Sequence, residues 1–164
     1  MMRAECEMDK WDARFFELCG FIAAWSEDRR RKIGALIVGP ANEIRSLGFN
    51  GLPRGVSGER DDRHRPDERE KYYWFEHAER NAIYNAARAG TSTEGCRIYV
   101  SLFPCADCTR AIIQSGIAQV NTFPPPKNDE MYDRSFDVAL TMLEEAGLEL
   151  RLFRPPASSA SSQS

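Results

Sequence analysis

The stretch RIYVSLFPCADCTRAIIQSGIAQVNTF, residues 97–123, decides the fold class of this 164-residue chain. Residues 97–103 alternate in polarity as a strand does, and residues 105–115 have the pattern of a helix that ends before Gly116. Residues 117–123 indicate a second strand. A strand, a helix and a strand in this order form a βαβ unit, whose two strands pair in parallel. A further helix over residues 131–146 and a last strand over 148–153 extend the pattern.

The chain before this stretch predicts an antiparallel start to the same sheet. Apolar residues recur at steps of three and four over residues 8–25, which indicates an amphipathic helix. Two strands, 33–38 and 43–49, are joined by a turn at 40–42 and form a hairpin. Residues 57–69 are expected to be irregular, and a helix is expected from about 69 to 88. The predicted fold class is therefore α/β with a mixed sheet.

Length and composition favour one ordinary domain. Hydrophobic residues make up 42% of the chain and charged residues 29%, a globular balance. We predict a single domain over residues 1–154, followed by a disordered tail rich in Ser and Pro at 155–164. The net charge of −3 disfavours a broad nucleic-acid binder.

The expected compartment is the cytoplasm. No apolar run approaches the roughly 20 residues that cross a bilayer, so no membrane partner is expected. The acidic N-terminal segment lacks an apolar secretory core. Five cysteines, an odd number spread over the chain, do not suggest a disulfide framework.

Two short motifs carry the chemistry, His77-Ala78-Glu79 and Pro104-Cys105-Ala106-Asp107-Cys108. Cys105 and Cys108 are three residues apart at the start of a predicted helix, so both sulfurs can face one point. The helix N-terminus also favours the thiolate form. His77 supplies a third ligand if the two helix starts meet. Three nitrogen and sulfur ligands suit Zn²⁺ and leave the fourth position open for water.

Glu79 gives this site a hydrolytic character. It is two residues from His77, close enough to take a proton from a zinc-bound water without being a ligand. A structural zinc site would show a fourth Cys or His in a close pair, whereas the other candidates are scattered singly. A redox pair would need a thioredoxin-like context. An H-x-E motif followed by P-C-x-x-C is the signature of zinc deaminases.

With these motifs and three further blocks, the sequence resembles the zinc-dependent deoxycytidylate (dCMP) deaminases of the cytidine deaminase-like superfamily. The further blocks are IGALIV (33–38), GFNGLPRG (48–55) and YVSLFPC (99–105) running on to IIQSGI (112–117). The resemblance implies a three-layer α/β/α domain with a five-stranded mixed sheet. It also implies that His77, Cys105 and Cys108 hold zinc and that Glu79 is catalytic.

The mechanism implied is hydrolytic. Glu79 would deprotonate the water, hydroxide would attack C4 of cytosine while Glu79 protonates N3, and loss of ammonia would give dUMP. The resemblance places Asn50 at the sugar and Ala78 among the substrate-binding residues. It also implies assembly into homo-oligomers, dimers or hexamers, and control by a nucleotide effector.

Other substrate-binding candidates come from the residues themselves. Arg54, in the glycine-rich loop, is a phosphate or effector candidate. The basic run 29–32 is either a phosphate contact or a solvated turn. Tyr132 and Arg134 are pocket candidates, with an ordinary helix start as the alternative. Residues 123–132 depart from the family pattern in a region that shapes the nucleotide pocket.

Two rival functions stay open. One is a zinc deaminase of another nucleoside or nucleotide, such as modified dCMP, cytidine or AMP. A base within tRNA is disfavoured by the net charge and by the absence of a basic C-terminal helix. The other rival is a non-catalytic zinc-binding scaffold, which would not need Glu79.

Overall fold

The computed structural model describes residues 5–65, 70–126 and 132–155. Its centre is a five-stranded sheet in the order β2-β1-β3-β4-β5. The strands β1 (Gly34–Val38) and β2 (Ile44–Phe49) form the antiparallel hairpin, and β1 also pairs antiparallel with β3 (Arg97–Val100). β3, β4 (Gln119–Thr122) and β5 (Glu149–Leu152) are parallel. The predicted mixed sheet is confirmed.

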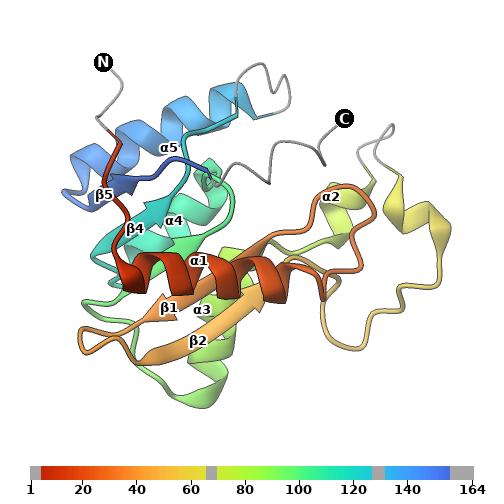
Figure 1. Cartoon of the computed structure of the whole chain (residues 1–164). Coiled ribbons are helices and arrows are strands. Elements are labelled where there is room, and N and C mark those ends of the chain that lie inside the picture. The colour runs from red at the N-terminus through yellow and green to blue at the C-terminus, as the bar shows by residue number, and fades with distance from the viewer. Residues whose placement is uncertain (1–4, 66–69, 127–131, 156–164) are drawn as a thin grey trace.

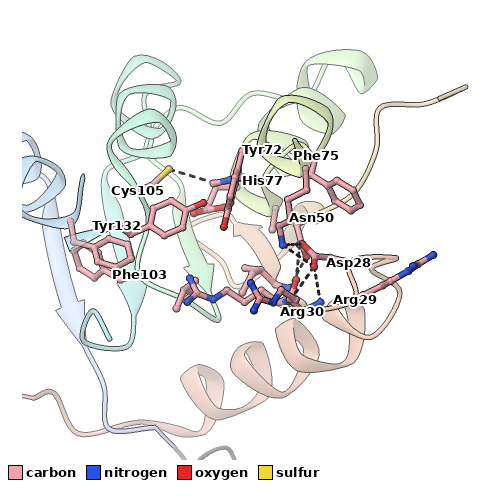
Figure 2. A pocket seen from close by; sticks show the side chains of 17 residues that line it. Asp28, Arg29, Arg30, Asn50, Tyr72, Phe75, His77, Phe103, Cys105 and Tyr132 are labelled. Atoms are coloured by element: carbon pink, nitrogen blue, oxygen red, sulfur yellow. Dashed lines mark hydrogen bonds and ion pairs between the residues drawn. The ribbon is translucent and has the colours of Figure 1, made fainter. Parts of the chain in front are cut away.

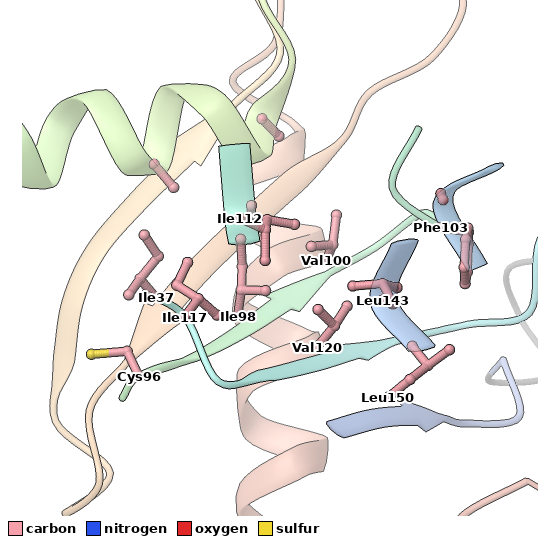
Figure 3. Packing of buried hydrophobic residues seen from close by; sticks show 14 of the residues in the cluster. Ile37, Cys96, Ile98, Val100, Phe103, Ile112, Ile117, Val120, Leu143 and Leu150 are labelled. Atoms are coloured by element: carbon pink, nitrogen blue, oxygen red, sulfur yellow. The ribbon is translucent and has the colours of Figure 1, made fainter. Parts of the chain in front are cut away.

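Helices cover both faces of this sheet, which gives three layers (Figure 1). α1 (Lys10–Ala23) lies on one face, and α3 (Ala78–Ala89), α4 (Ala106–Gln114) and α5 (Asp133–Glu145) lie on the other. Side chains of β1 alternate between the layers, because successive residues of a strand point to opposite faces. Leu36 and Val38 pack with α1, while Ala35 and Ile37 join the core under α3, α4 and α5 (Figure 3). The expected α/β/α architecture is confirmed.

α1 is tied to the sheet by a buried carboxylate. Asp9 caps the helix in a capping box with Asp12. Asp12 is 1% exposed and accepts hydrogen bonds from the Tyr99 hydroxyl at 2.7 Å and from the Arg151 guanidinium at 2.9 and 3.0 Å. The charge is therefore paired across three elements, α1, β3 and β5.

The prediction of one continuous helix over residues 69–88 is wrong in one respect. The structure has two helices there, the four-residue α2 (Lys71–Trp74) and α3, separated by Phe75, Glu76 and His77. The backbone of Glu76 forms an isolated bridge with Gly51, at 3.0 and 2.8 Å. This pairing keeps the segment extended and so starts a new helix directly after His77.

Other boundaries differ by a few residues. The segment expected to be irregular contains a short 3₁₀ helix at Asp61–His64. β3 ends at Val100 rather than at residue 103, and β4 begins at Gln119 rather than at residue 117. Residues 1–4, 66–69, 127–131 and 156–164 lie outside the described residues, and with them most of the predicted tail and half of the departing segment 123–132. Within the described ranges, every helix is too short or too polar to cross a bilayer.

Candidate active site

Two helix starts bring three metal-ligating atoms together. His77 occupies the N-cap position of α3, Cys105 occupies that of α4, and Cys108 lies in the first turn of α4. His77 Nδ1 is 3.5 Å from Cys105 Sγ and 3.4 Å from Cys108 Sγ, and the three atoms lie within 4.8 Å of one another. Around tetrahedral Zn²⁺, nitrogen and sulfur ligands are about 3.6 Å apart. The donor set and its spacing therefore fit zinc.

The electrostatics of the two thiols differ. A hydrogen bond from Cys108, helped by contact with His77, lowers the pKa of Cys105 to about 4. The same hydrogen bond and burial raise the pKa of Cys108 above its ordinary value. Burial opposes a charged imidazole, but contact with Cys105 and the charge of Glu79 raise the pKa of His77. The lowered pKa favours the thiolate form of Cys105, which is the form that binds metals.

Glu79 lies in the first turn of α3, two residues after His77. Its side chain is 4% exposed and lines the cavity beside the three ligand atoms. Burial raises the pKa of this carboxyl, while the charge of His77 opposes the rise. A carboxyl with a raised pKa can both accept and return a proton near neutral pH.

The cavity in front of these residues has a volume of about 540 Å³. Tyr132 stands over it, with its ring 6.4 Å from that of His77 and 6.1 Å from that of Tyr72, and it stacks on Phe136 at 5.7 Å. Phe75 and Phe103 complete the aromatic lining. Aromatic faces of this kind suit a planar heterocycle.

The far end of the cavity is charged. Figure 2 shows His77 and Cys105 on one side of the pocket and Asp28 with Asn50 on the other. The basic run contributes three lining residues there. Arg29 pairs with Asp61 at 2.7 Å, Arg31 places its guanidinium 5.8 Å from the Tyr132 ring centre, and Arg30 makes no ion pair with any described residue.

The structure gathers most of the predicted site residues at this cavity. Besides the three ligands and Glu79, the lining includes Asn50, Ala78 and Tyr132. Two candidates lie elsewhere. Arg54 is exposed and donates to Asn85 Oδ1 at 2.6 Å, and Arg134 is exposed near the start of α5.

Sequence reasoning missed several residues that line the cavity. Asp28 lies just beyond the helix predicted over residues 8–25, and Lys71 and Tyr72 fall inside the helix predicted from about 69 to 88. The one signal available was a pair of acidic residues, Glu27 and Asp28, directly before a run of four basic ones. Nothing in the local pattern linked Asp28 to Lys71, 43 residues away.

The comparisons with known proteins agree with this geometry. Residues 9–123 match the model of the cytidine and deoxycytidylate deaminase zinc-binding region. A deaminase encoded in the luxG 3′ region of Aliivibrio fischeri is 40% identical over 147 residues, covering 87% of this chain and 93% of the relative. Human deoxycytidylate deaminase is 35% identical over 153 residues, covering 91% of this chain and 83% of the human protein.

A solved structure shares the fold. The dCMP deaminase of the cyanophage S-TIM5, in complex with dCMP and dUMP, superposes with a TM-score of 0.71 and 24% identity, over 90% of this chain and all of the phage chain. The paired histidine and cysteines at two helix starts, the family model and these relatives together show that the chain belongs to the cytidine and deoxycytidylate deaminase family, whose cofactor is zinc.

Proposed function

We propose that this protein deaminates dCMP to dUMP and ammonia by hydrolysis. The observation that carries the proposal is the position of Glu79, buried beside His77, Cys105 and Cys108 at one end of a cavity whose other end holds arginines. The human relative, named for its action on deoxycytidylate, matches 91% of this chain and supports the choice of substrate.

The chemistry follows from the side chains around the cavity. His77 Nδ1 and the sulfurs of Cys105 and Cys108 would hold zinc, which when bound supplies Lewis acidity that makes water nucleophilic near neutral pH. Glu79 takes a proton from the attacking water and delivers it to N3 of the cytosine ring. As the C4–N4 bond breaks and the C4 carbonyl forms, Glu79 takes the remaining proton of the added water from the C4 hydroxyl and passes it to the departing amino group. The products are ammonia and the uracil ring.

Substrate recognition is divided along the cavity. Tyr72 and Tyr132 hold the pyrimidine ring, and Asn50 and Ala78 contact the sugar and base. The phosphate lies against the arginines of the basic run, because a doubly charged oxyanion needs cationic partners. Arg54 and Arg134 have no part in this proposal, since neither lines the cavity.

Ammonia release tests the proposal directly. The zinc-loaded protein is assayed with dCMP, CMP, deoxycytidine, dCTP, 5-methyl-dCMP and AMP, with Glu79→Ala as the control variant. The expected result is a strong preference for dCMP that Glu79→Ala abolishes. Preference for another compound would keep the mechanism and replace the substrate. If the zinc-loaded protein released no ammonia from any of these compounds, the proposal would be refuted and a zinc-binding scaffold would be favoured.

We also propose a homo-oligomer, a dimer or a hexamer, acting in the cytoplasm. Large aromatic side chains are exposed on and after α1, Phe21 at 64% and Trp25 at 52%, which favours a contact surface. All five cysteines are free, as in a reducing compartment. Light scattering that gives the mass of a monomer at working concentration would contradict the assembly. Subcellular fractionation checks the compartment.

A further inference from the structure

A buried ion pair lies in the wall of the cavity, away from the ligand atoms. Lys71 Nζ contacts both carboxylate oxygens of Asp28, at 2.7 and 3.0 Å. The two side chains are 9% and 5% exposed, and both line the cavity. A lysine ammonium is rarely buried this far, because its desolvation is costly unless a carboxylate compensates for it.

The carboxylate of Asp28 also organises the backbone of the basic run. Asp28 Oδ1 accepts hydrogen bonds from the backbone N–H of Arg30 at 2.8 Å and of Arg31 at 3.2 Å. Residues 29–31 belong to no helix or strand, so these bonds are a main constraint on their conformation. We call residues 29–31 the arginine loop.

Asn50 continues the same network. Its Nδ2 donates to Asp28 Oδ2 at 3.2 Å and to the carbonyl of Arg31 at 2.7 Å, and its Oδ1 accepts from the N–H of Ile33 at 2.8 Å. Asp28 and Asn50 thus hold the loop and the residue that leads into β1. Dashed lines in Figure 2 mark this cluster.

Lys71 connects the arginine loop to the opposite wall. It begins α2, and the next residue of that helix, Tyr72, presents its ring to Tyr132 at 6.1 Å. Arg31 approaches the same Tyr132 ring from the loop side. One ammonium therefore joins the loop at the charged end of the cavity to the helix that carries part of its aromatic wall.

We propose that Lys71 is a positioning residue. Through Asp28 it sets the arginine loop at the distance from His77 and Glu79 that a nucleoside monophosphate requires. The inference rests on the proposed function, because it takes the phosphate to lie at the loop. Lys71 itself need not touch the substrate.

Removing the ammonium leaves the Asp28 carboxylate buried without its counter-charge. The carboxylate then draws in water or turns outward, and the N–H groups of Arg30 and Arg31 lose their common acceptor. The phosphate contacts loosen, while His77, Glu79 and the cysteines stay on α3 and α4. The expected effect is on the binding of a phosphorylated substrate rather than on the chemical step.

The test compares Lys71→Met, which keeps an unbranched side chain one atom shorter and removes the charge, with Lys10→Met, which removes an exposed lysine at the start of α1. Each variant is assayed with dCMP and with deoxycytidine, which has no phosphate. For Lys71→Met we expect kcat/KM for dCMP to fall about 10- to 100-fold, mainly through KM, with little change for deoxycytidine. Lys10→Met should match the parent. Equal losses on both substrates, or no loss, would overturn the proposal.

A second measurement does not depend on activity. Hydrogen exchange of a peptide that spans residues 29–33 should become faster in Lys71→Met, because the amides of Arg30, Arg31 and Ile33 lose protection. If the parent protein fails to deaminate dCMP, the proposed function fails, and faster exchange would still support the positioning role. Unchanged exchange would overturn that role whatever the activity.

A conservative variant covers the case in which Lys71→Met does not fold. Lys71→Arg keeps the charge but changes the reach and geometry of the cation. It should fold and show a smaller rise in KM for dCMP, with kcat unchanged. A parental KM for dCMP and parental exchange over residues 29–33 would contradict the requirement for a lysine at this position.

Discussion

Glu79 is the residue on which the proposed chemistry depends most. Its carboxyl is buried, and this burial raises its pKa. Glu79 lies in the first turn of α3, which forms part of the cavity wall. Glutamine has nearly the same shape as glutamate but no ionisable proton. A Glu79→Gln variant therefore tests proton transfer without changing the packing of the side chain.

Glu79→Gln should lower kcat for dCMP by about 10²- to 10⁴-fold, since a positioned acid–base group contributes roughly that much. Zinc content should stay at the parental level, because Glu79 does not belong to the group of three ligand atoms. Ammonia release and elemental analysis measure the two effects. The matched control is Glu94→Gln at an exposed position. Activity within tenfold of the parent would remove Glu79 from the proton-transfer role.

Asp28 leads to a prediction about pH. Burial alone would raise the pKa of this carboxyl, but hydrogen bonds from Lys71 and from the backbone of Arg30 outweigh it and lower the pKa below the ordinary value. A lowered pKa in the folded state stabilises the protein fully above the ordinary pKa, and this contribution is lost as the pH falls through the folded value.

Asp28→Asn should therefore destabilise the protein by about 3–5 kcal/mol near neutral pH, the usual cost of breaking a buried pair. The difference from the parent should begin to shrink below about pH 4, where the Asp28 carboxyl of the unfolded chain takes up a proton, and should go on shrinking as the pH falls through the lowered pKa of the folded state. Urea unfolding from pH 3 to 7 measures both curves. A difference that stays constant over the whole range would show that the charge of Asp28 does not contribute.

At the scale of elements, the placement of α3 against β2 decides where His77 and Glu79 lie. A Cβ on Gly48 would overlap the backbone of Ala78 and Ala82, so only glycine permits this approach. Asn81 and Asn85 on α3 donate to the carbonyls of Phe49 and Leu47, at 2.8 and 2.7 Å. The asparagines satisfy carbonyl groups along the edge strand of the sheet.

Gly48→Ala should destabilise the protein by about 1–3 kcal/mol, the usual cost of overpacking, and should lower activity by shifting the start of α3. Gly20→Ala is the control, because Gly20 is exposed on α1 and a Cβ there meets nothing within 4 Å. That variant should be more stable by about 0.5–1 kcal/mol, since alanine favours helix. Thermal unfolding and ammonia release measure both variants. Parental stability of Gly48→Ala would contradict the close packing.

At the scale of the whole molecule, the site joins two helices whose ligands are 28 residues apart in sequence. The fold itself rests on the two hydrophobic clusters, one on each face of the sheet. Zinc should therefore add stability to a domain that folds without it, as a ligand that binds only the native state does.

Chelation should abolish deamination and lower the unfolding temperature, while the far-ultraviolet circular dichroism spectrum stays native. The loss of stability should be about 2.7 kcal/mol if the parent is measured at 100 times the zinc dissociation constant. Adding zinc back should restore both properties. Loss of the native spectrum at room temperature would show instead that metal binding drives folding.

The sequence by itself determined the features that depend on neighbours along the chain. Spacings of two, three and four residues place side chains on one face of a strand or helix. They predict the βαβ unit and the hairpin, and they place the sulfurs of Cys105 and Cys108 on the same side of a helix start. The H-x-E motif followed by P-C-x-x-C also identified the family, which the comparisons confirmed. The roles of Asn50, Ala78 and Tyr132 at the substrate stay predictions.

Only the tertiary structure decided the features that depend on distant partners. The bridge between Gly51 and Glu76 divides a segment that looks like one helix. Asn50 faces the cavity and Arg54 does not, although four residues separate them. Lys71 meets Asp28 because the packing of α2 against the arginine loop buries both charges together. Local patterns carry no information on such contacts, since burial and pairing arise only once the layers have assembled.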